Sequence, residues 1–204
     1  MVFSWDSSRL AFADAAEWFV RTATLVQDQW DRPGLGEWDV RALVGHTSRS
    51  LLTVEAYLAR PATEVEVASA VEYYRATRAA AAGPAVAARG RDAGTALGAD
   101  PAAAVAEIAA RVRPLLDGCD GTERITTIVG GMRLADYLPT RTFELAVHTT
   151  DLATALGLPP EVPTTAAAQA LHLVADLALA DRLAGPLLLA ATGRTGLPTG
   201  FSVL

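Results

Sequence analysis

The residues that most constrain the fold are 141–157, where polar and apolar positions repeat with the period of an α-helix. Glu144 and His148 lie four residues apart in this stretch, so their side chains meet on one helix face. At about 100° per residue, that face collects a narrow polar stripe made of Tyr137, Arg141, Glu144, His148, Asp151 and Ala155. Apolar side chains flank the stripe, with Leu138, Leu145 and Leu152 on one side and Phe143 and Val147 on the other. The sequence therefore predicts a helix that points a charged stripe into the interior.

The side opposite the stripe is predicted to form the outer surface of this helix. Its residues are small and uncharged, namely Thr142, Ala146, Thr149 and Ala153. Pro139 lies just before the stretch and either kinks the helix or marks its start.

Burying the stripe requires compensation, because an ionised carboxylate taken out of water costs several kcal/mol unless a partner offsets that cost. A divalent metal is one such partner, and helix bundles hold metals through inward carboxylates and imidazoles on facing helices. The alternative is an exposed ion pair between Glu144 and His148, worth only a few tenths of a kcal/mol. A metal site needs a further ligand elsewhere in the chain.

The chain has three histidines, and the two others differ in their neighbours. His172 shares a helical face with Gln169 and Asp176 and is predicted to be a surface residue. The face of His46 is mostly apolar and holds Leu43, Ser50, Thr53, Val54 and Tyr57. A single inward histidine is usually a hydrogen-bonded core residue, but an inward His46 together with Glu144 and His148 favours a metal site.

Composition indicates a globular protein with one main domain, because 51% of the 204 residues are hydrophobic and 20% are charged. The net charge of −6 and the lack of a basic run argue against nucleic acid or an anionic membrane surface as a partner. No apolar segment reaches the roughly 20 residues of a membrane helix, and no signal peptide is recognisable. A cytoplasmic protein is expected. Its basic residues are all arginine, a bias typical of a GC-rich genome such as an actinobacterial one.

Several further segments have helical periodicity, separated by breaks rich in Gly and Pro. Strong patterns cover 6–30, 39–60 and 100–117, and a fifth helix is predicted to begin at Thr164 or Thr165 and end at Gly185. Weaker patterns cover 64–82 and 84–97, the latter interrupted by glycines. Asp39 is predicted to cap the second helix, with Trp38 and Leu43 as a hydrophobic staple.

Short extended segments are predicted beside these helices. Residues 125–129 are rich in β-branched side chains, and residues 186–191 and 201–204 are predicted as two short strands around a Gly-rich turn. The predicted fold is mainly α: a four-helix bundle over residues 1–158, followed by a short C-terminal α+β appendage over 163–204 that consists of one helix and two strands.

Three segments together carry a resemblance to a known family. They are WDVRALVGH (Trp38–His46), GGMRLADYL (Gly130–Leu138) and RTFELAVHTTDL (Arg141–Leu152). Over roughly residues 5–160 the chain resembles the mycothiol-dependent maleylpyruvate isomerase family, a branch of the DinB-like metal-binding four-helix bundles. The resemblance implies that His46, Glu144 and His148 ligate a divalent metal, usually zinc, and that mycothiol is the cosubstrate.

The neighbours of these residues have two possible roles each. Asp151, one turn beyond His148, is suited to accept a proton from the second nitrogen of a ligating imidazole. Arg141 is suited either to pair with Glu144 or Asp151 or to hold an acidic substrate. For both, a structural salt bridge is the alternative.

The resulting hypothesis is a metal-dependent enzyme whose partners are a small-molecule thiol and an electrophilic or acidic substrate. Cys119 is the only cysteine and lies at a helix end, which excludes an internal disulfide and a cysteine-based zinc site. The thiol would therefore come from outside and act in S-transfer or in cis–trans isomerisation of a maleylpyruvate-like acid. One alternative is a metal-binding or small-ligand-binding protein without turnover. Another is a metal-dependent hydrolase, for which no general base stands out. The catalytic residues and the oligomeric state are left open.

Overall fold

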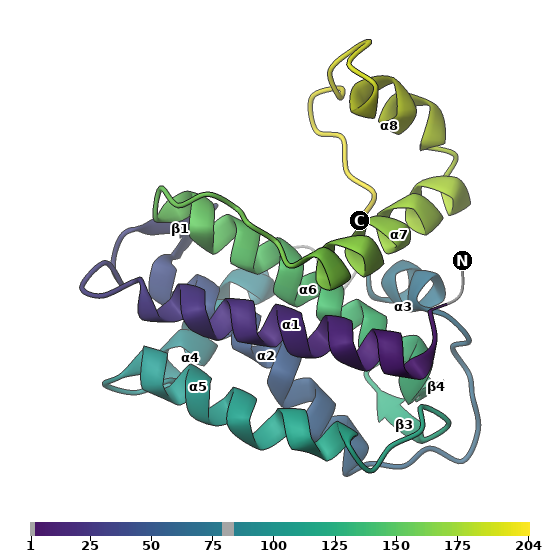
Figure 1. Ribbon diagram of the computed structural model, residues 1–204, viewed down its shortest axis with the longest axis horizontal. Coiled ribbons are helices and arrows are strands. Elements are labelled where there is room, and N and C mark those ends of the chain that lie inside the picture. The colour runs from purple at the N-terminus through teal and green to yellow at the C-terminus, as the bar shows by residue number, and fades with distance from the viewer. Residues whose placement is uncertain (1–2, 79–83) are drawn as a thin grey trace.

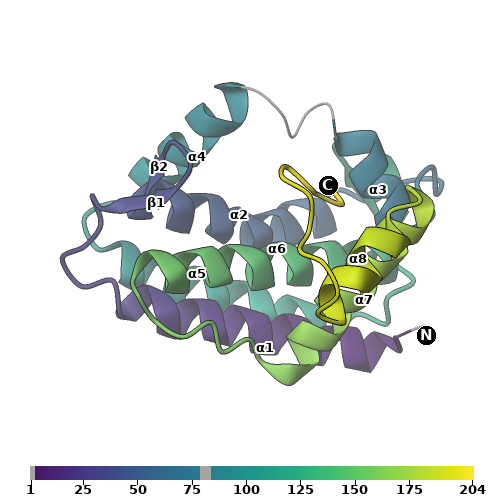
Figure 2. The ribbon, with the colours of Figure 1, turned by 90° about the horizontal axis from the view of Figure 1, so that it is seen from above.

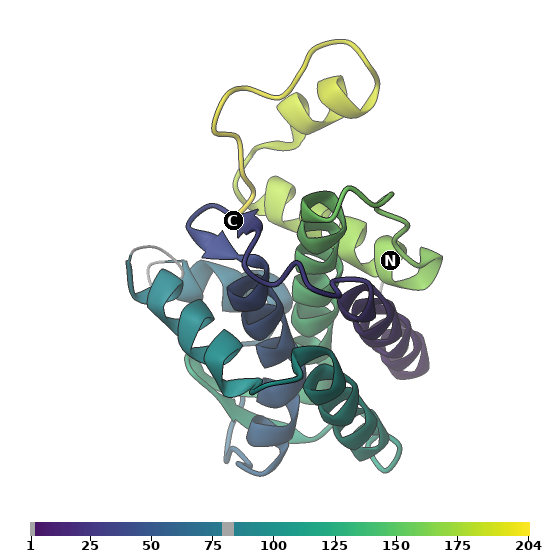
Figure 3. The ribbon, with the colours of Figure 1, turned by 90° about the vertical axis from the view of Figure 1, so that its left-hand side faces the viewer.

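The main body of the protein is a bundle of four helices (Figure 1), described in a computed structural model that covers residues 3–78 and 84–204. These helices are α1 (Trp5–Thr24), α2 (Val40–Leu58), α5 (Pro101–Val112) and α6 (Leu134–Ala155). Both α1 and α2 pack against α5 and α6, so the four helices close a ring that Figure 3 shows nearly end-on. The predicted mainly α class and the bundle are confirmed.

Four further helices lie outside this bundle; the first three pack against its helices, and the last packs against the third. They are α3 (Ala70–Thr77), α4 (Pro84–Ala96), α7 (Thr164–Ala180) and α8 (Ala184–Ala191), and a 3₁₀ turn, Arg113–Leu116, follows α5. In Figure 2, α3 and α4 lie on the same side of the α2–α6 pair and near its opposite ends. None of the described helices combines the length and apolarity needed to cross a membrane.

Two short hairpins lead into bundle helices. β1 (Pro33–Leu35) pairs antiparallel with β2 (Trp38–Asp39) just before α2. β3 (Arg124–Thr127) pairs antiparallel with β4 (Gly130–Arg133), and α6 begins at the next residue. The extended segment predicted at 125–129 is thus a strand as far as Thr127. Pro139 lies inside α6 and does not mark its start.

α6 is surrounded by other helices, and this corrects the prediction of a solvent-exposed side. Thr142 and Thr149 are 0% exposed, Ala153 2% and Ala146 3%. Helices α1, α2, α3 and α7 all pack against α6. Small uncharged side chains suit a helix surface, but they equally permit close approach of a neighbouring helix, and in this protein they serve the second purpose.

The glycines that weaken the pattern at 84–97 are contact points between α4 and the rest of the bundle. A Cβ on Gly45 of α2 would lie 2.1 Å from the backbone nitrogen of Gly94, so only glycine allows these two helices to approach so closely. A Cβ on Gly90 would lie 2.5 Å from the indole ring of Trp38. The Nε1 of Trp38 also donates a hydrogen bond to the Ala87 carbonyl oxygen at 3.0 Å. The weak pattern is therefore a genuine helix, α4, and it fixes Trp38 in place.

The helix ends agree in part with their predicted signals. The Asp39 carboxylate accepts a hydrogen bond from the Ala42 amide at 2.7 Å and caps α2 as predicted. For α7 the predicted threonine cap is wrong, because Pro163 occupies the cap position and the Thr165 hydroxyl donates to Asp14 instead. Of the pattern at 64–82, residues 70–77 form α3, and residues 79–82 lie outside the described part of the chain.

The two predicted C-terminal strands are wrong. Residues 184–191 form α8, and residues 201–204 have neither helical nor strand structure. The run of leucine and alanine before Thr192 has a high helix propensity, and this outweighs the short apolar pattern that suggested a strand. Figure 1 shows α8 standing away from the bundle, and the tail then returns toward it, where Val203 is 9% exposed.

Candidate metal centre

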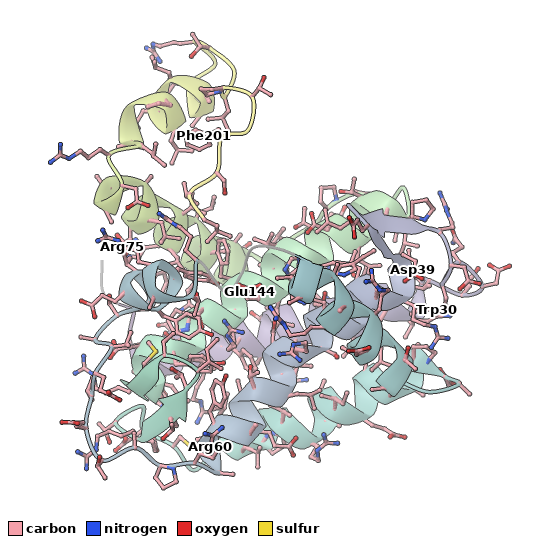
Figure 4. All side chains as sticks on the ribbon, turned by 180° about the vertical axis from the view of Figure 1, so that it is seen from behind. Trp30, Asp39, Arg60, Arg75, Glu144 and Phe201 are labelled. Carbon is pink, nitrogen blue, oxygen red and sulfur yellow. The ribbon has the colours of Figure 1, made fainter. Side chains whose placement is uncertain are left out.

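The three side chains predicted as metal ligands meet between α2 and α6. His46 of α2 and Glu144 and His148 of α6 each offer one donor atom, and these atoms all lie within 4.8 Å of one another. Figure 4 shows Glu144 near the centre of the molecule. The predicted convergence of two imidazoles and one carboxylate from two helices is therefore present in the structure.

Hydrogen bonds join Glu144 and His148 to two further residues. The His148 Nε2 lies 3.2 Å from Glu144 Oε2, and its Nδ1 lies 3.0 Å from Asp151 Oδ2. The other oxygen of Glu144, Oε1, accepts a hydrogen bond from the Tyr74 hydroxyl at 2.7 Å. Each polar atom of the Glu144 and His148 side chains thus has a partner. Asp151 lies beside Nδ1 of His148, next to the ring nitrogen that does not face Glu144.

The protonation of the pair follows from its surroundings. Burial alone raises the pKa of Glu144, but the hydrogen bond from His148, the charge of Arg141 and the hydrogen bond from Tyr74 together lower it to about 2. Burial alone lowers the pKa of His148, but its hydrogen bonds to Asp151 and Glu144 raise it to about 9. At neutral pH a carboxylate therefore faces an imidazolium, and the proton on His148 supplies the positive charge that balances Glu144.

His46 lies between two aromatic rings. Its ring centroid is 4.5 Å from that of Trp38, at an interplanar angle of 33°, and 4.9 Å from that of His148. Burial and the neighbouring His148 lower the pKa of His46 to about 4, so the imidazole is neutral. Its Nδ1 is buried and has no hydrogen-bond partner among the described residues, an arrangement that costs about 1–3 kcal/mol for an ordinary polar group.

Arg141 differs from the prediction of a salt bridge. Its guanidinium carbon lies 5.0 Å from the ring centroid of Tyr137 and 5.5 Å from that of Tyr73, and its Nε donates to the Thr140 hydroxyl at 2.9 Å. Within the described part of the chain it forms no ion pair with Glu144 or with Asp151. Arg141 is 8% exposed, so its charge is buried against aromatic rings, and Glu144 acts on it through its charge rather than through a salt bridge.

The donor cluster opens into a cavity of about 720 Å³. Its wall contains His46, Glu144 and His148, together with aromatic rings from α2 and α3. The arginines in this wall are Arg49, Arg78, Arg89 and Arg141. Among the lining residues that the structure describes, Glu144 is the single acidic side chain. Arg78 is paired with Asp181, but the other three arginines still outnumber Glu144, so the cavity wall is electropositive in a protein of net charge −6.

Sequence reasoning missed two residues that shape this cluster, Tyr74 and Trp38. Tyr74 lies on α3 and was one position of the weak helical pattern at 64–82, but that pattern gave no sign of a contact with Glu144. Trp38 was interpreted only as a staple residue. All four tyrosines of the chain gather at this end of α6: Tyr57, Tyr73 and Tyr74 line the cavity, and Tyr137 packs against Tyr57 and Tyr73.

The fold and the converging donors place the protein among helix bundles that carry an interior cluster of histidine and carboxylate side chains. A model of the mycothiol maleylpyruvate isomerase N-terminal domain family matches residues 11–153, more than half of the chain. The chain therefore belongs to this family, as the resemblance implied. The matched range contains His46, Glu144 and His148 and ends before α7. No curated protein and no solved structure matches the chain.

Proposed function

We propose that the protein is a divalent-metal-dependent enzyme that uses mycothiol as cosubstrate, either for S-transfer or for cis–trans isomerisation of a maleylpyruvate-like acid. In this proposal His46, Glu144 and His148 ligate the metal, which we take to be zinc. The observation that carries the proposal is the meeting of these three donors at the wall of an electropositive cavity.

The donor set fits a divalent cation in three ways. Two imidazoles and one carboxylate are a ligand set of catalytic zinc sites, which keep a further position open. The 3.2 Å between Glu144 Oε2 and His148 Nε2 is close to the roughly 3.3 Å between two donors on a tetrahedral zinc ion. The His46 imidazole is neutral, and its buried Nδ1 makes no hydrogen bond to the described residues, so the chain leaves part of its capacity to bind a partner unused.

Asp151 would orient His148 in this site. A ligating histidine usually donates its second ring N–H to a carboxylate, which fixes the tautomer and makes the imidazole a better ligand. The contact between His148 Nδ1 and Asp151 Oδ2 at 3.0 Å supplies that arrangement and leaves Nε2 directed toward Glu144.

The thiol would come from outside the protein. A bound metal ion lowers the pKa of a thiol that coordinates it, so it supplies a nucleophile at neutral pH. The protein's single cysteine cannot take this role, because Cys119 is absent from the cavity wall and burial raises the pKa of its thiol to about 11. Mycothiol is the thiol that the family's description names.

The chemistry of the thiolate sulfur accounts for both candidate reactions. In S-transfer the sulfur bonds to an electrophilic carbon and the leaving group departs with its electron pair. In isomerisation the thiolate adds to a cis carbon–carbon double bond, and the π electrons move onto the conjugated carbonyl as an enolate. The resulting single bond rotates, and return of the enolate electrons expels the thiolate and restores the double bond in the trans form. The second sequence regenerates the thiol, so no net oxidant or reductant is needed.

Arg141 would bind the acidic group of the substrate. A buried charge without a salt bridge is costly. The guanidinium of Arg141 packs against two tyrosine rings and forms no salt bridge with a described carboxylate, although burial lowers its pKa and the charge of Glu144 helps to raise it. It also forms part of the cavity wall beside Glu144. Arginine binds carboxylates through two parallel hydrogen bonds, so an acid in the cavity would complete its interactions.

Metal analysis combined with a thiol assay tests this proposal. Wild type, His148→Ala and the matched surface variant His172→Ala would be stripped of metal and reloaded with Zn²⁺. Bound zinc would then be measured. Isomerisation would be followed as the mycothiol-dependent conversion of maleylpyruvate to its trans isomer, and S-transfer as the consumption of mycothiol with an activated aryl halide. We expect one ion per chain and thiol-dependent turnover in wild type and His172→Ala, and loss of both in His148→Ala.

Two other outcomes separate the alternatives. Tight zinc binding without any thiol affinity would favour a metal-binding or small-ligand-binding protein without turnover. A wild-type protein that binds no divalent metal would contradict the proposal as a whole.

A further inference from the structure

The two oxygens of Glu144 have different partners. Oε1 accepts a hydrogen bond from the Tyr74 hydroxyl at 2.7 Å, whereas Oε2 lies 3.2 Å from His148 Nε2, on the side of the proposed ligands. A carboxylate can bind a metal through one oxygen or through both. In this geometry one oxygen is already engaged by a residue from a different helix.

The position of the Tyr74 hydroxyl is fixed by packing. Tyr74 is 8% exposed, and its ring makes edge-to-face contacts with Phe143 at 5.5 Å and with Tyr73 at 5.7 Å. The hydroxyl also lies 3.2 Å from the Thr140 carbonyl oxygen, a second acceptor on α6. Both acceptors belong to α6, so Tyr74 connects α3 to the part of α6 that carries Glu144.

We infer that Tyr74 is a positioning residue that keeps Glu144 a one-oxygen ligand and thereby preserves an open position for the external thiol. This inference rests on the metal site proposed above. Burial and the charge of Glu144 raise the pKa of the Tyr74 phenol well above its ordinary value, so the protonated hydroxyl donates to Oε1 and holds that oxygen away from the ion.

The number of ligands explains why this hydrogen bond matters. Catalytic zinc sites use three protein donors and leave the fourth position to water or substrate. If both oxygens of Glu144 bound the ion, His46 and His148 would complete a four-donor set without the thiol. The Tyr74 hydroxyl therefore acts through Glu144 on access to the metal, and it need not contact the substrate.

Substitution of Tyr74 by Phe tests this role, because it removes one hydroxyl and retains the packed ring. Tyr73→Phe is the matched control: Tyr73 is the adjacent residue on α3, is 5% exposed, lines the same cavity, and its hydroxyl makes no hydrogen bond to the described residues. Wild type and both variants would be loaded with Co²⁺, whose visible absorption reports coordination number. 2-Mercaptoethanol would then be titrated into each, and the sulfur-to-cobalt charge-transfer band recorded.

We expect wild type and Tyr73→Phe to have the same cobalt spectrum and the same thiol affinity. In Tyr74→Phe the visible absorption should change as the freed oxygen joins the metal, and thiol affinity should fall by about tenfold or more, while Co²⁺ affinity changes by less than about threefold. A Tyr74→Phe protein that binds Co²⁺ with an unchanged spectrum and unchanged thiol affinity would overturn the inference. Failure of wild type to bind Co²⁺ would instead contradict the proposed metal site.

A measurement on the wild-type chain covers the case in which Tyr74→Phe does not fold. In a crystal structure of the zinc-loaded protein, we expect one Glu144 oxygen at about 2.0–2.2 Å from the ion and the other still hydrogen-bonded to Tyr74. Two Glu144 oxygens at bonding distance would contradict the inference, even though they would support the metal site.

Discussion

Helices α6 and α7 each carry a histidine and a carboxylate four residues apart. On α6, Glu144 and His148 approach to 3.2 Å, and their side chains are 19% and 15% exposed. On α7, His172 and Asp176 approach to 3.5 Å, and their side chains are 33% and 44% exposed. The spacing is the same, so the difference in burial must arise from what packs against each helix.

The surroundings of the two pairs explain why one of them is a candidate site. The α6 pair faces α2, which supplies His46, and α3, which supplies the hydrogen bond from Tyr74. Asp151 adds a second carboxylate to His148. The His172 ring instead makes an edge contact with Phe3 at 5.5 Å. Helical spacing alone therefore creates an ion pair, and donors from neighbouring helices are needed to build a site.

The largest expected difference between the two helices is in zinc affinity after a histidine is replaced. We expect His148→Ala and His46→Ala to weaken Zn²⁺ binding by more than about a hundredfold, beyond the 10–100-fold typical of a residue that only supports a ligand. His172→Ala should leave zinc affinity unchanged. Competition with a chromogenic chelator measures all three. An equal loss of zinc affinity in His148→Ala and His172→Ala would contradict the proposal that only the α6 pair binds metal.

Changing the carboxylates to amides should have a smaller effect. Asp151→Asn keeps the size of the side chain but weakens its hydrogen bond to His148 Nδ1, so we expect a 10–100-fold loss of zinc affinity. Asp176→Asn on α7 is the matched control and should bind zinc like wild type. An Asp151→Asn protein with wild-type affinity would show that Asp151 forms only a structural ion pair.

Metal affinity should also depend on pH through the α6 pair. Zinc requires a neutral imidazole, and in the metal-free protein the pKa of His148 is raised to about 9. Affinity should therefore rise by roughly tenfold per pH unit from pH 7 and level off above pH 9. The other two ligands do not add to this pH dependence, because they are already deprotonated at pH 7. The pKa of Glu144 is about 2 and that of His46 is about 4.

Calorimetry in two buffers of different ionisation enthalpy measures the linked proton. About one proton should be released per zinc ion at pH 7, and zinc binding without proton release would contradict the assigned state of His148. The same raised pKa gives the metal-free protein stability that is fully present below pH 6.5 and is lost as the pH rises through 9.

The smallest expected effect is the change in the free energy of unfolding when His172 of the α7 pair is replaced. His172 is partly exposed and its ion pair is weak, so His172→Ala should change the free energy of unfolding by less than about 0.5 kcal/mol. Urea denaturation of the metal-free protein measures this change. A loss of several kcal/mol would show that the α7 pair supports the bundle.

Much of the bundle and the donor set could be predicted because both depend on local patterns. Apolar periodicity predicted α1, α2, α5 and α6, and the spacing of Glu144 and His148 predicted a shared face. The direction of His46 followed from the apolar residues around it. These predictions needed no knowledge of how distant parts of the chain pack.

The features that could not be predicted depend on contacts between distant segments. The burial of Thr142 and Thr149 follows from α1, α2 and α7 packing around α6, and the Gly45–Gly94 contact turns a weak helical pattern into a tightly packed helix. Tyr74 lies 70 residues from Glu144 in the chain, so no spacing rule connects them. The strand predicted at 186–191 was wrong for a local reason, because the helix propensity of its leucines and alanines outweighs the short apolar pattern.

Anomalous diffraction from crystals of the zinc-loaded protein, recorded on both sides of the zinc absorption edge, tests the central claim most directly. We predict one anomalous peak per chain, within bonding distance of His46, Glu144 and His148. A peak beside His172 and Asp176, or no peak between α2 and α6, would contradict the account.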